Sequence, residues 1–226
     1  MAWDSRVWID RVWTFVGNCR ALPGRVGVRV NISPPLNEKE ADLLATQLPL
    51  GLPRPLRAFL VDGARCCRCT IFWAPPDWNV VKAVIPGQIE LYAGPRIVAP
   101  AELVELQESN NNAAESFEQY WPDWKLVPQL WRRCTRFMDI GNGDYLGLDT
   151  SISNEEAPVV YLSHDEEEST RVIAPSFESF METWEQLCYV GPEIWMLRPF
   201  LDPGTGYLTA DTPKAEQLRS LFPFLS

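Results

Sequence analysis

The only histidine of the chain, His164, lies directly before Asp165 at the end of an apolar run. A nucleophilic pair would need this imidazole as its base, with Ser163, Cys134 or Cys188 as the nucleophile. Successive side chains of a strand point to opposite faces, so Ser163 and Asp165 cannot both reach the ring from a regular strand. The sequence therefore predicts a structural or interface histidine and no catalytic residue. A small hydrolase that uses His164 is the alternative.

The cysteines offer a second kind of chemistry. Cys66 and Cys69 have the Cys-x-x-Cys spacing of a metal site. Structural zinc needs four ligands, and the one imidazole lies about a hundred residues away, so we expect neither a metal site nor a cofactor. The six cysteines are predicted to be reduced thiols, several of them buried.

The segment GNGDYLGLDT, residues 141–150, carries two glycines and two carboxylates. It is no phosphate-binding loop, because no Lys follows at the required spacing and a strand, not a helix, comes next. Apolar residues separate Asp144 from Asp149, which argues against a calcium loop. We expect a tight hairpin in which Asn142 and Gly143 take positive φ and the two carboxylates lie at the two ends of the following strand.

Negative charge is concentrated around this hairpin. Residues 139–182 hold eleven carboxylates and one base, Arg171. The formal charge of this segment, -10, equals that of the whole chain. Such a surface can attract a basic protein and disfavours binding of nucleic acid, although a charge run in a loop can equally be solvated surface. The residues predicted to bind a partner are Asp144, Asp149, Glu155, Glu156, Asp165, Glu166, Glu167 and Glu168.

The periodicity of the 226 residues predicts the elements that position these side chains. Amphipathic spacing predicts helices, alternation predicts strands, and the polar run Ser109 to Asn112 predicts a surface loop. A strand at 159–162 with two apolar faces must be covered on both sides. The expected helices cover residues 3–16, 38–48, 56–61, 101–109, 177–187 and 214–221, and further strands cover 26–32, 67–73 and 144–149.

The chain shows no apolar run of about 18 residues, so we expect no membrane span. Charged residues from Asp4 to Arg11 interrupt the apolar stretch that a secretion signal requires. These features predict a cytoplasmic protein.

Several segments, in order, resemble the SUKH superfamily, which is shared by yeast cell-wall regulators and many bacterial immunity proteins. They are LPRPLRAFLVDGA, DIGNGDYLGLDT, VVYLSHD and IAPSFESFMETW. The resemblance covers residues 36–187. The chain departs from the family pattern in a Trp-rich N-terminal extension, a Pro-rich insertion between Phe72 and Ile89, and about forty residues after Leu187. Asp62-Gly63-Ala64 stands where the pattern has Asn-Gly-Gly.

The resemblance implies an α+β fold with a mainly antiparallel, bent sheet that carries helices. We expect an extension at 1–35, a SUKH-like domain at 36–187 and a second extension at 188–226, both extensions packed on the core. The resemblance also implies a protein without catalysis. It predicts an immunity protein that neutralises a cognate toxin, a nuclease or a deaminase, by covering a basic surface, with Trp or Tyr anchors at the centre of the interface. A regulatory or scaffold protein of the same fold is the alternative, and self-association stays open.

Overall fold

The computed structural model describes residues 3–225 except 152 and 154. An open antiparallel sheet of eight strands runs through it, in the order β1-β2-β4-β5-β6-β7-β8, and β3 pairs with β2 beside β4. The predicted α+β class with a mainly antiparallel sheet is confirmed. The strands are β1 (Arg25–Ser33), β2 (Cys66–Ala74), β3 (Leu91–Ala93), β4 (Arg96–Ile97), β5 (Cys134–Asp139), β6 (Tyr145–Asp149), β7 (Val159–Leu162) and β8 (Arg171–Ala174).

Ten α-helices surround this sheet in the described part of the chain. A π-helical turn, Phe59–Gly63, continues the third of them. Among the described residues, no helix combines the length and the apolar character that crossing a bilayer requires. The helices are α1 (Ser5–Cys19), α2 (Glu38–Gln47), α3 (Arg54–Ala58), α4 (Asn79–Val84), α5 (Pro100–Glu108), α6 (Asn110–Tyr120), α7 (Leu126–Arg133), α8 (Phe177–Gln186), α9 (Ile194–Leu197) and α10 (Pro213–Ser220).

Local signals set several helix starts where the sequence predicted them. The Asn37 side chain accepts from the backbone N–H of Glu40, whose carboxylate accepts from the Asn37 N–H, so a capping box begins α2. Ser176 caps α8 by accepting from the backbone N–H of Ser179 (3.1 Å). Each cap satisfies donors at the helix N-terminus that would otherwise have no partner within the helix.

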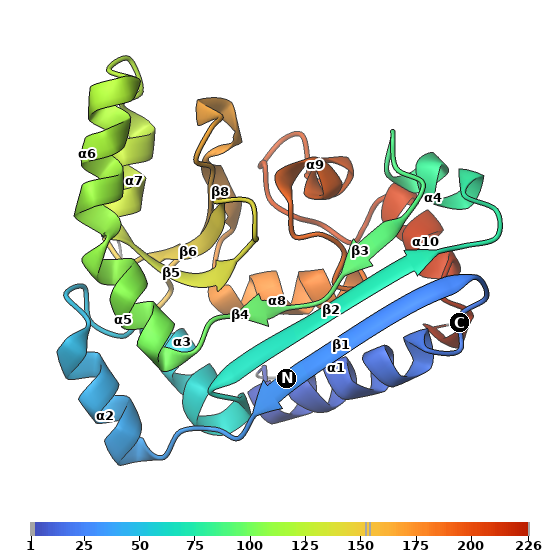
Figure 1. The fold of residues 1–226 in the computed structure, drawn as a ribbon, viewed down its shortest axis with the longest axis horizontal. Helices are drawn as coiled ribbons and strands as arrows, with labels where there is room; N and C mark the ends of the chain where they lie inside the picture. The colour runs from blue at the N-terminus through green and yellow to red at the C-terminus, as the bar shows by residue number, and fades with distance from the viewer. Residues whose placement is uncertain (1–2, 152, 154, 226) are drawn as a thin grey trace.

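The main core lies between one face of the sheet and the helices α1 and α8, which lie behind the long paired strands β1 and β2 in Figure 1. It draws on the whole length of the chain, from Trp8 in α1 to Phe200 and Leu218 near the C-terminus. The N-terminal segment also adds β1, which pairs with β2 from Arg25 to Ser33.

A second, smaller core forms on the opposite face of the sheet, under the α6–α7 hairpin that stands at the left of Figure 1. The strand β7 contributes to both cores. Val159 and Tyr161 face the main core, and Val160 and Leu162 face the second one. This confirms that β7 is covered on both faces, which its two apolar faces required.

The structure corrects the prediction of a surface loop at Ser109 to Asn112. The helix α6 begins at Asn110, whose side chain is buried and whose Nδ2 donates to the carbonyl oxygen of Cys134 (3.1 Å). Its Oδ1 accepts from Nε of Arg136 (2.9 Å), a guanidinium that lies over the ring of Trp131. Burial lowers the pKa of Arg136 to about 10. Asn110 is therefore a hydrogen-bond acceptor for a buried guanidinium, and composition alone did not reveal this role.

Candidate functional site

The turn between β5 and β6 brings Asp144 to the end of β7. The positive-φ residues of this turn are Gly141 (φ 96°) and Gly143 (φ 104°), so the prediction that Asn142 takes positive φ is wrong. Asn142 instead accepts from the Asp144 N–H through Oδ1 (2.9 Å), as polar side chains commonly do in turns. A Cβ on Gly143 would lie 3.1 Å from the ring of His164, so glycine also allows the histidine to approach.

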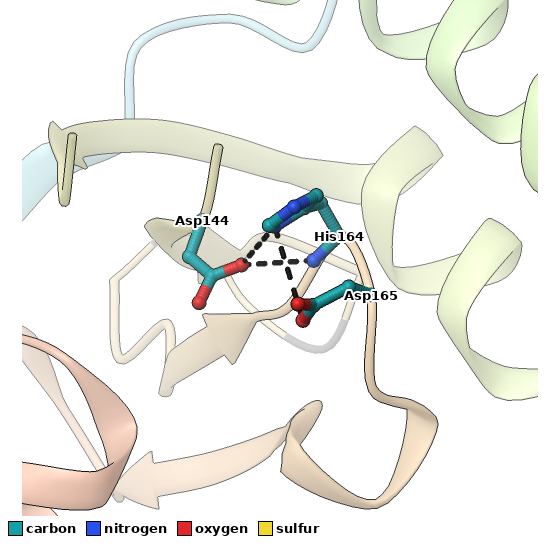
Figure 2. A group of neighbouring side chains, drawn as sticks. All are labelled: Asp144, His164 and Asp165. Atoms are coloured by element: carbon teal, nitrogen blue, oxygen red, sulfur yellow. Dashed lines mark hydrogen bonds and ion pairs between the residues drawn. The ribbon is translucent and has the colours of Figure 1, made fainter. Parts of the chain in front are cut away.

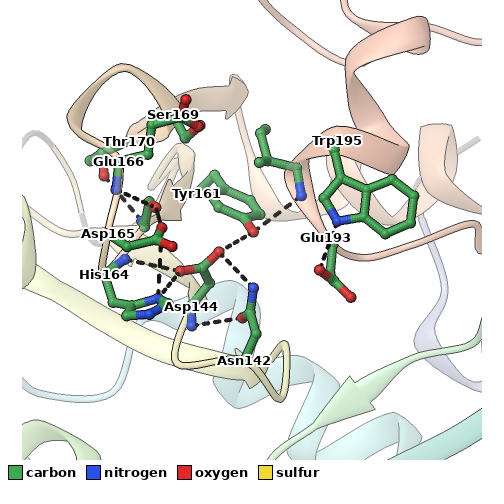
Figure 3. Close-up of polar contacts among 12 residues, drawn as sticks. Asn142, Asp144, Tyr161, His164, Asp165, Glu166, Ser169, Thr170, Glu193 and Trp195 are labelled. Carbon is green, nitrogen blue, oxygen red and sulfur yellow. Dashed lines mark hydrogen bonds and ion pairs between the residues drawn. The ribbon is translucent and has the colours of Figure 1, made fainter. Parts of the chain in front are cut away.

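Asp144 is buried and lies at the centre of the polar network drawn in Figure 3. Its Oδ2 accepts from the Tyr161 hydroxyl (2.5 Å) and from Nδ2 of Asn142 (3.1 Å). Its Oδ1 accepts from the His164 N–H (2.9 Å) and lies 2.7 Å from His164 Nδ1. Burial acts to raise the pKa of Asp144, but the hydrogen bonds from Tyr161, His164 and Asn142 outweigh burial and hold that pKa below its usual value.

The same network extends to the C-terminal part of the chain. The Tyr161 hydroxyl accepts from the backbone N–H of Ile194 (3.1 Å), and Trp195 donates to Glu193 beside it (2.7 Å). Asp144 therefore couples the β5–β6 turn, the end of β7 and the start of α9. This arrangement fixes three segments that are far apart in the sequence.

His164 and Asp165 complete a small cluster of possible metal ligands (Figure 2). One ligand atom each from Asp144, His164 and Asp165 lies within 4.8 Å of the others. Imidazole nitrogen and carboxylate oxygen are ligands that divalent transition metals accept, so these three residues could hold such an ion. The sequence did not predict this juxtaposition, because Asp144 is twenty positions from His164.

The candidate nucleophiles of the hydrolase alternative show no hydrogen bond to the His164 ring among the described residues. The Ser163 hydroxyl donates to Asp165 (3.1 Å). Cys134 and Cys188 are buried, and desolvation raises the pKa of both thiols, to about 12 for Cys188. A raised pKa disfavours the thiolate, the form of cysteine that attacks a substrate. All six cysteines are free and buried.

The acidic run after β7 is an ordered loop. Glu166 accepts from the Arg198 guanidinium (2.8 Å) and from the Ser169 hydroxyl. Glu167 accepts from the backbone N–H of Lys125, at the start of α7 (3.1 Å). Asp165 and Glu168 are exposed, with 68% of the Asp165 side chain accessible. Glu166 and Glu167 thus hold the loop in place, and Glu166 is exposed together with Asp165 and Glu168.

The remaining predicted residues lie at the other end of β6. Asp149 is buried, pairs with Arg133 (2.8 Å) and accepts from the Ser151 hydroxyl (2.7 Å). Glu155 is exposed and pairs with Arg54 on α3 (3.0 Å), and Glu156 is exposed beside it.

The eight carboxylates therefore do not line one continuous rim. A strand of five residues separates Asp144 and Asp149 by roughly 17 Å. Asp144 and the loop 165–168 lie at one end of the β6–β7 pair, and Asp149, Glu155 and Glu156 lie at the other. Asp144 and Asp149 are buried, so they can position neighbouring loops but offer little surface to a partner.

Fold and site together define a class: an α+β protein with an open, helix-covered antiparallel sheet and polar networks that stiffen the loops at the strand ends. The model of the SMI1 / KNR4 family (SUKH-1) matches residues 35–183, and the chain belongs to this family. No curated protein matches the chain. SUKH proteins are generally non-enzymatic immunity or regulatory proteins, and their domains are protein-interaction modules. Family membership thus suggests a non-catalytic module of one of these two kinds.

Proposed function

We propose that the chain is a cytoplasmic immunity protein that neutralises a cognate toxin by covering a basic surface of it. The loop 165–168 is the contact region with the best support. It concentrates four carboxylates in sequence, and its conformation is fixed by Arg198, by the Lys125 N–H and by the backbone of His164 on Asp144. Fixed charges raise the association rate with a partner of opposite charge without an ordering cost at binding.

A toxin that attacks nucleic acid needs cationic side chains to hold phosphates. A rigid acidic loop is complementary to such a surface and can occupy it. Glu155 and Glu156, at the other end of the β6–β7 pair, form a second exposed acidic group and supply an internal comparison.

The test uses two double variants that change the net charge equally. Asp165→Lys with Glu168→Lys reverses two exposed charges of the loop and spares Glu166 and Glu167, which hold it in place. Glu155→Lys with Glu156→Lys is the matched control. The binding partner is a catalytically inactive form of the toxin domain that, on this proposal, we expect an adjacent gene to encode, and association is followed by surface plasmon resonance.

The loop variant is expected to lower the association rate about tenfold or more at low salt, and the loss should shrink as salt shortens the Debye length from about 10 Å at 0.1 M to about 3 Å at 1 M. The control should change the rate much less. Equal losses would show that net charge acts without a defined face, and no loss in either variant would contradict the proposal.

A further inference from the structure

A group of large apolar side chains is exposed at the tip of the α6–α7 hairpin. Tyr120, Trp121 and Leu126 are 67%, 42% and 46% exposed. Trp124, between them, is partly buried. We call these four residues the aromatic tip. Exposed large apolar side chains that cluster together commonly mark interaction sites, whereas single scattered ones do not.

The aromatic tip is rigid. The rings of Trp121 and Trp124 stack with centroids 4.9 Å apart and planes 14° from parallel. Both rings also contact Phe117 of the second core, at 6.0 Å each. The backbone N–H of Trp121 donates to Phe117 (2.8 Å), and that of Trp124 donates to Trp121 (2.9 Å). Aromatic side chains held in this way lose little conformational entropy on binding, which is the property of interface anchors.

Carboxylates lie next to the aromatic tip. Glu167 of the acidic loop accepts from the Lys125 N–H, inside the tip turn, and therefore joins the two features. Asp123 is exposed in the same turn, and Asp165 and Glu168 are exposed in the loop. In Figure 1 the end of the α6–α7 hairpin and the turn before β8 rise on the same side of the molecule.

We propose that the aromatic tip docks on an apolar surface bordered by Lys and Arg side chains on the partner protein, while the adjacent carboxylates pair with that border. The inference rests on the proposed function and assigns its anchor residues. The same carboxylates disfavour the other occupants of an aromatic surface. Single-stranded nucleic acid needs cationic grooves beside its stacking platform, and anionic membranes attract basic residues.

The probe is a synthetic, dye-labelled amphipathic peptide of Leu and Lys, and a Leu/Glu peptide of the same length is its control. Binding to the full chain is followed by fluorescence anisotropy. The Leu/Lys peptide should bind and the Leu/Glu peptide should not. Trp121→Ala should weaken binding roughly thirtyfold, the loss typical of an interface anchor, and Tyr120→Ala should weaken it by about tenfold.

Trp78→Ala is the matched control, because Trp78 is exposed to a similar extent (45%). It directly precedes α4, which lies on the opposite side of Figure 1 from α6 and α7. Its replacement should leave peptide binding unchanged. Thermal unfolding checks that each variant folds, and Tyr120→Ala, the most exposed position, keeps the test decisive if Trp121→Ala is unstable. Absence of binding, or equal weakening by Trp78→Ala, overturns the inference. So does Trp121-dependent binding of anionic vesicles or of a single-stranded oligonucleotide.

The same variants with the toxin domain separate the two proposals. If Trp121→Ala keeps wild-type toxin affinity while the Asp165→Lys, Glu168→Lys variant loses it, the anchor fails and the proposed function stands. If the toxin domain does not bind the wild-type chain, but the Leu/Lys peptide binds it and Trp121→Ala weakens that binding, the proposed function fails and the docking surface stands.

Discussion

Replacement of Asp144 by alanine tests whether the carboxylate network holds the site together. The wild-type carboxylate is buried and accepts from Tyr161, from Asn142 and from two nitrogens of His164. Alanine removes both acceptor oxygens and leaves the O–H of the buried Tyr161 and the His164 N–H without an acceptor, while the Tyr161 oxygen still accepts from the Ile194 N–H. An unsatisfied buried donor costs about 1–3 kcal/mol.

Two such donors, together with the lost charge-assisted bonds, predict that Asp144→Ala lowers the free energy of unfolding by about 3–5 kcal/mol. Asn keeps one acceptor oxygen, so Asp144→Asn should cost about 1–3 kcal/mol. Since small proteins are stable by only about 5–15 kcal/mol, the alanine variant should unfold at a much lower urea concentration.

Urea unfolding followed by tryptophan fluorescence and circular dichroism measures these losses, and coincident transitions support a two-state treatment. Asp165→Asn is the control. Its side chain is mostly exposed and receives one hydrogen bond, from Ser163, so it should change stability by about 0.5 kcal/mol or less. A loss below about 1 kcal/mol for Asp144→Ala would refute the view that this carboxylate organises the strand ends.

Three further outcomes follow from single contacts. The pKa of Asp144 is lowered in the folded protein, so the ionised carboxylate stabilises the fold above the unfolded pKa of about 3.9, and this stabilisation is lost as pH falls through the folded pKa. Below about pH 4, the urea midpoint should therefore fall more in the wild type than in Asp144→Asn. Asn110→Ala removes the acceptor of Arg136 Nε and the donor to the Cys134 carbonyl, while the guanidinium keeps its bonds to Leu106 and Ser109, and it should cost about 2–4 kcal/mol by chemical denaturation. Asn111→Ala, at an exposed position, should be neutral. Gly147→Ala places a Cβ 2.8 Å from that of Cys134 and should lower the free energy of unfolding by about 1–3 kcal/mol. An unchanged thermal midpoint would show that β5 can shift to accommodate the methyl group.

The sequence determined features that depend on neighbours along the chain. Alternation and amphipathic spacing located β1, β7 and α8, and Asn37 and Ser176 marked helix starts because caps act within one turn. The order of motifs predicted the family, which the match over residues 35–183 shows. The strands β1, β2, β6 and β7 could be recognised because each carries its own apolar pattern, whereas the short strands β3, β4 and β8 were not predicted.

Tertiary structure decided which charges are exposed and which are structural. Asp144 and Asp165 look equivalent in sequence, yet the first is buried by Tyr161 and the second faces solvent. The run Ser109 to Asn112 looked like a loop because the guanidinium that requires Asn110 is 26 positions away. Pairing over such distances depends on how the chain folds back on itself, and no local pattern encodes it. The aromatic tip left a visible signal, three aromatic residues around Pro122 in a polar turn, but only its contact with Glu167 through Lys125 shows that it adjoins the acidic loop.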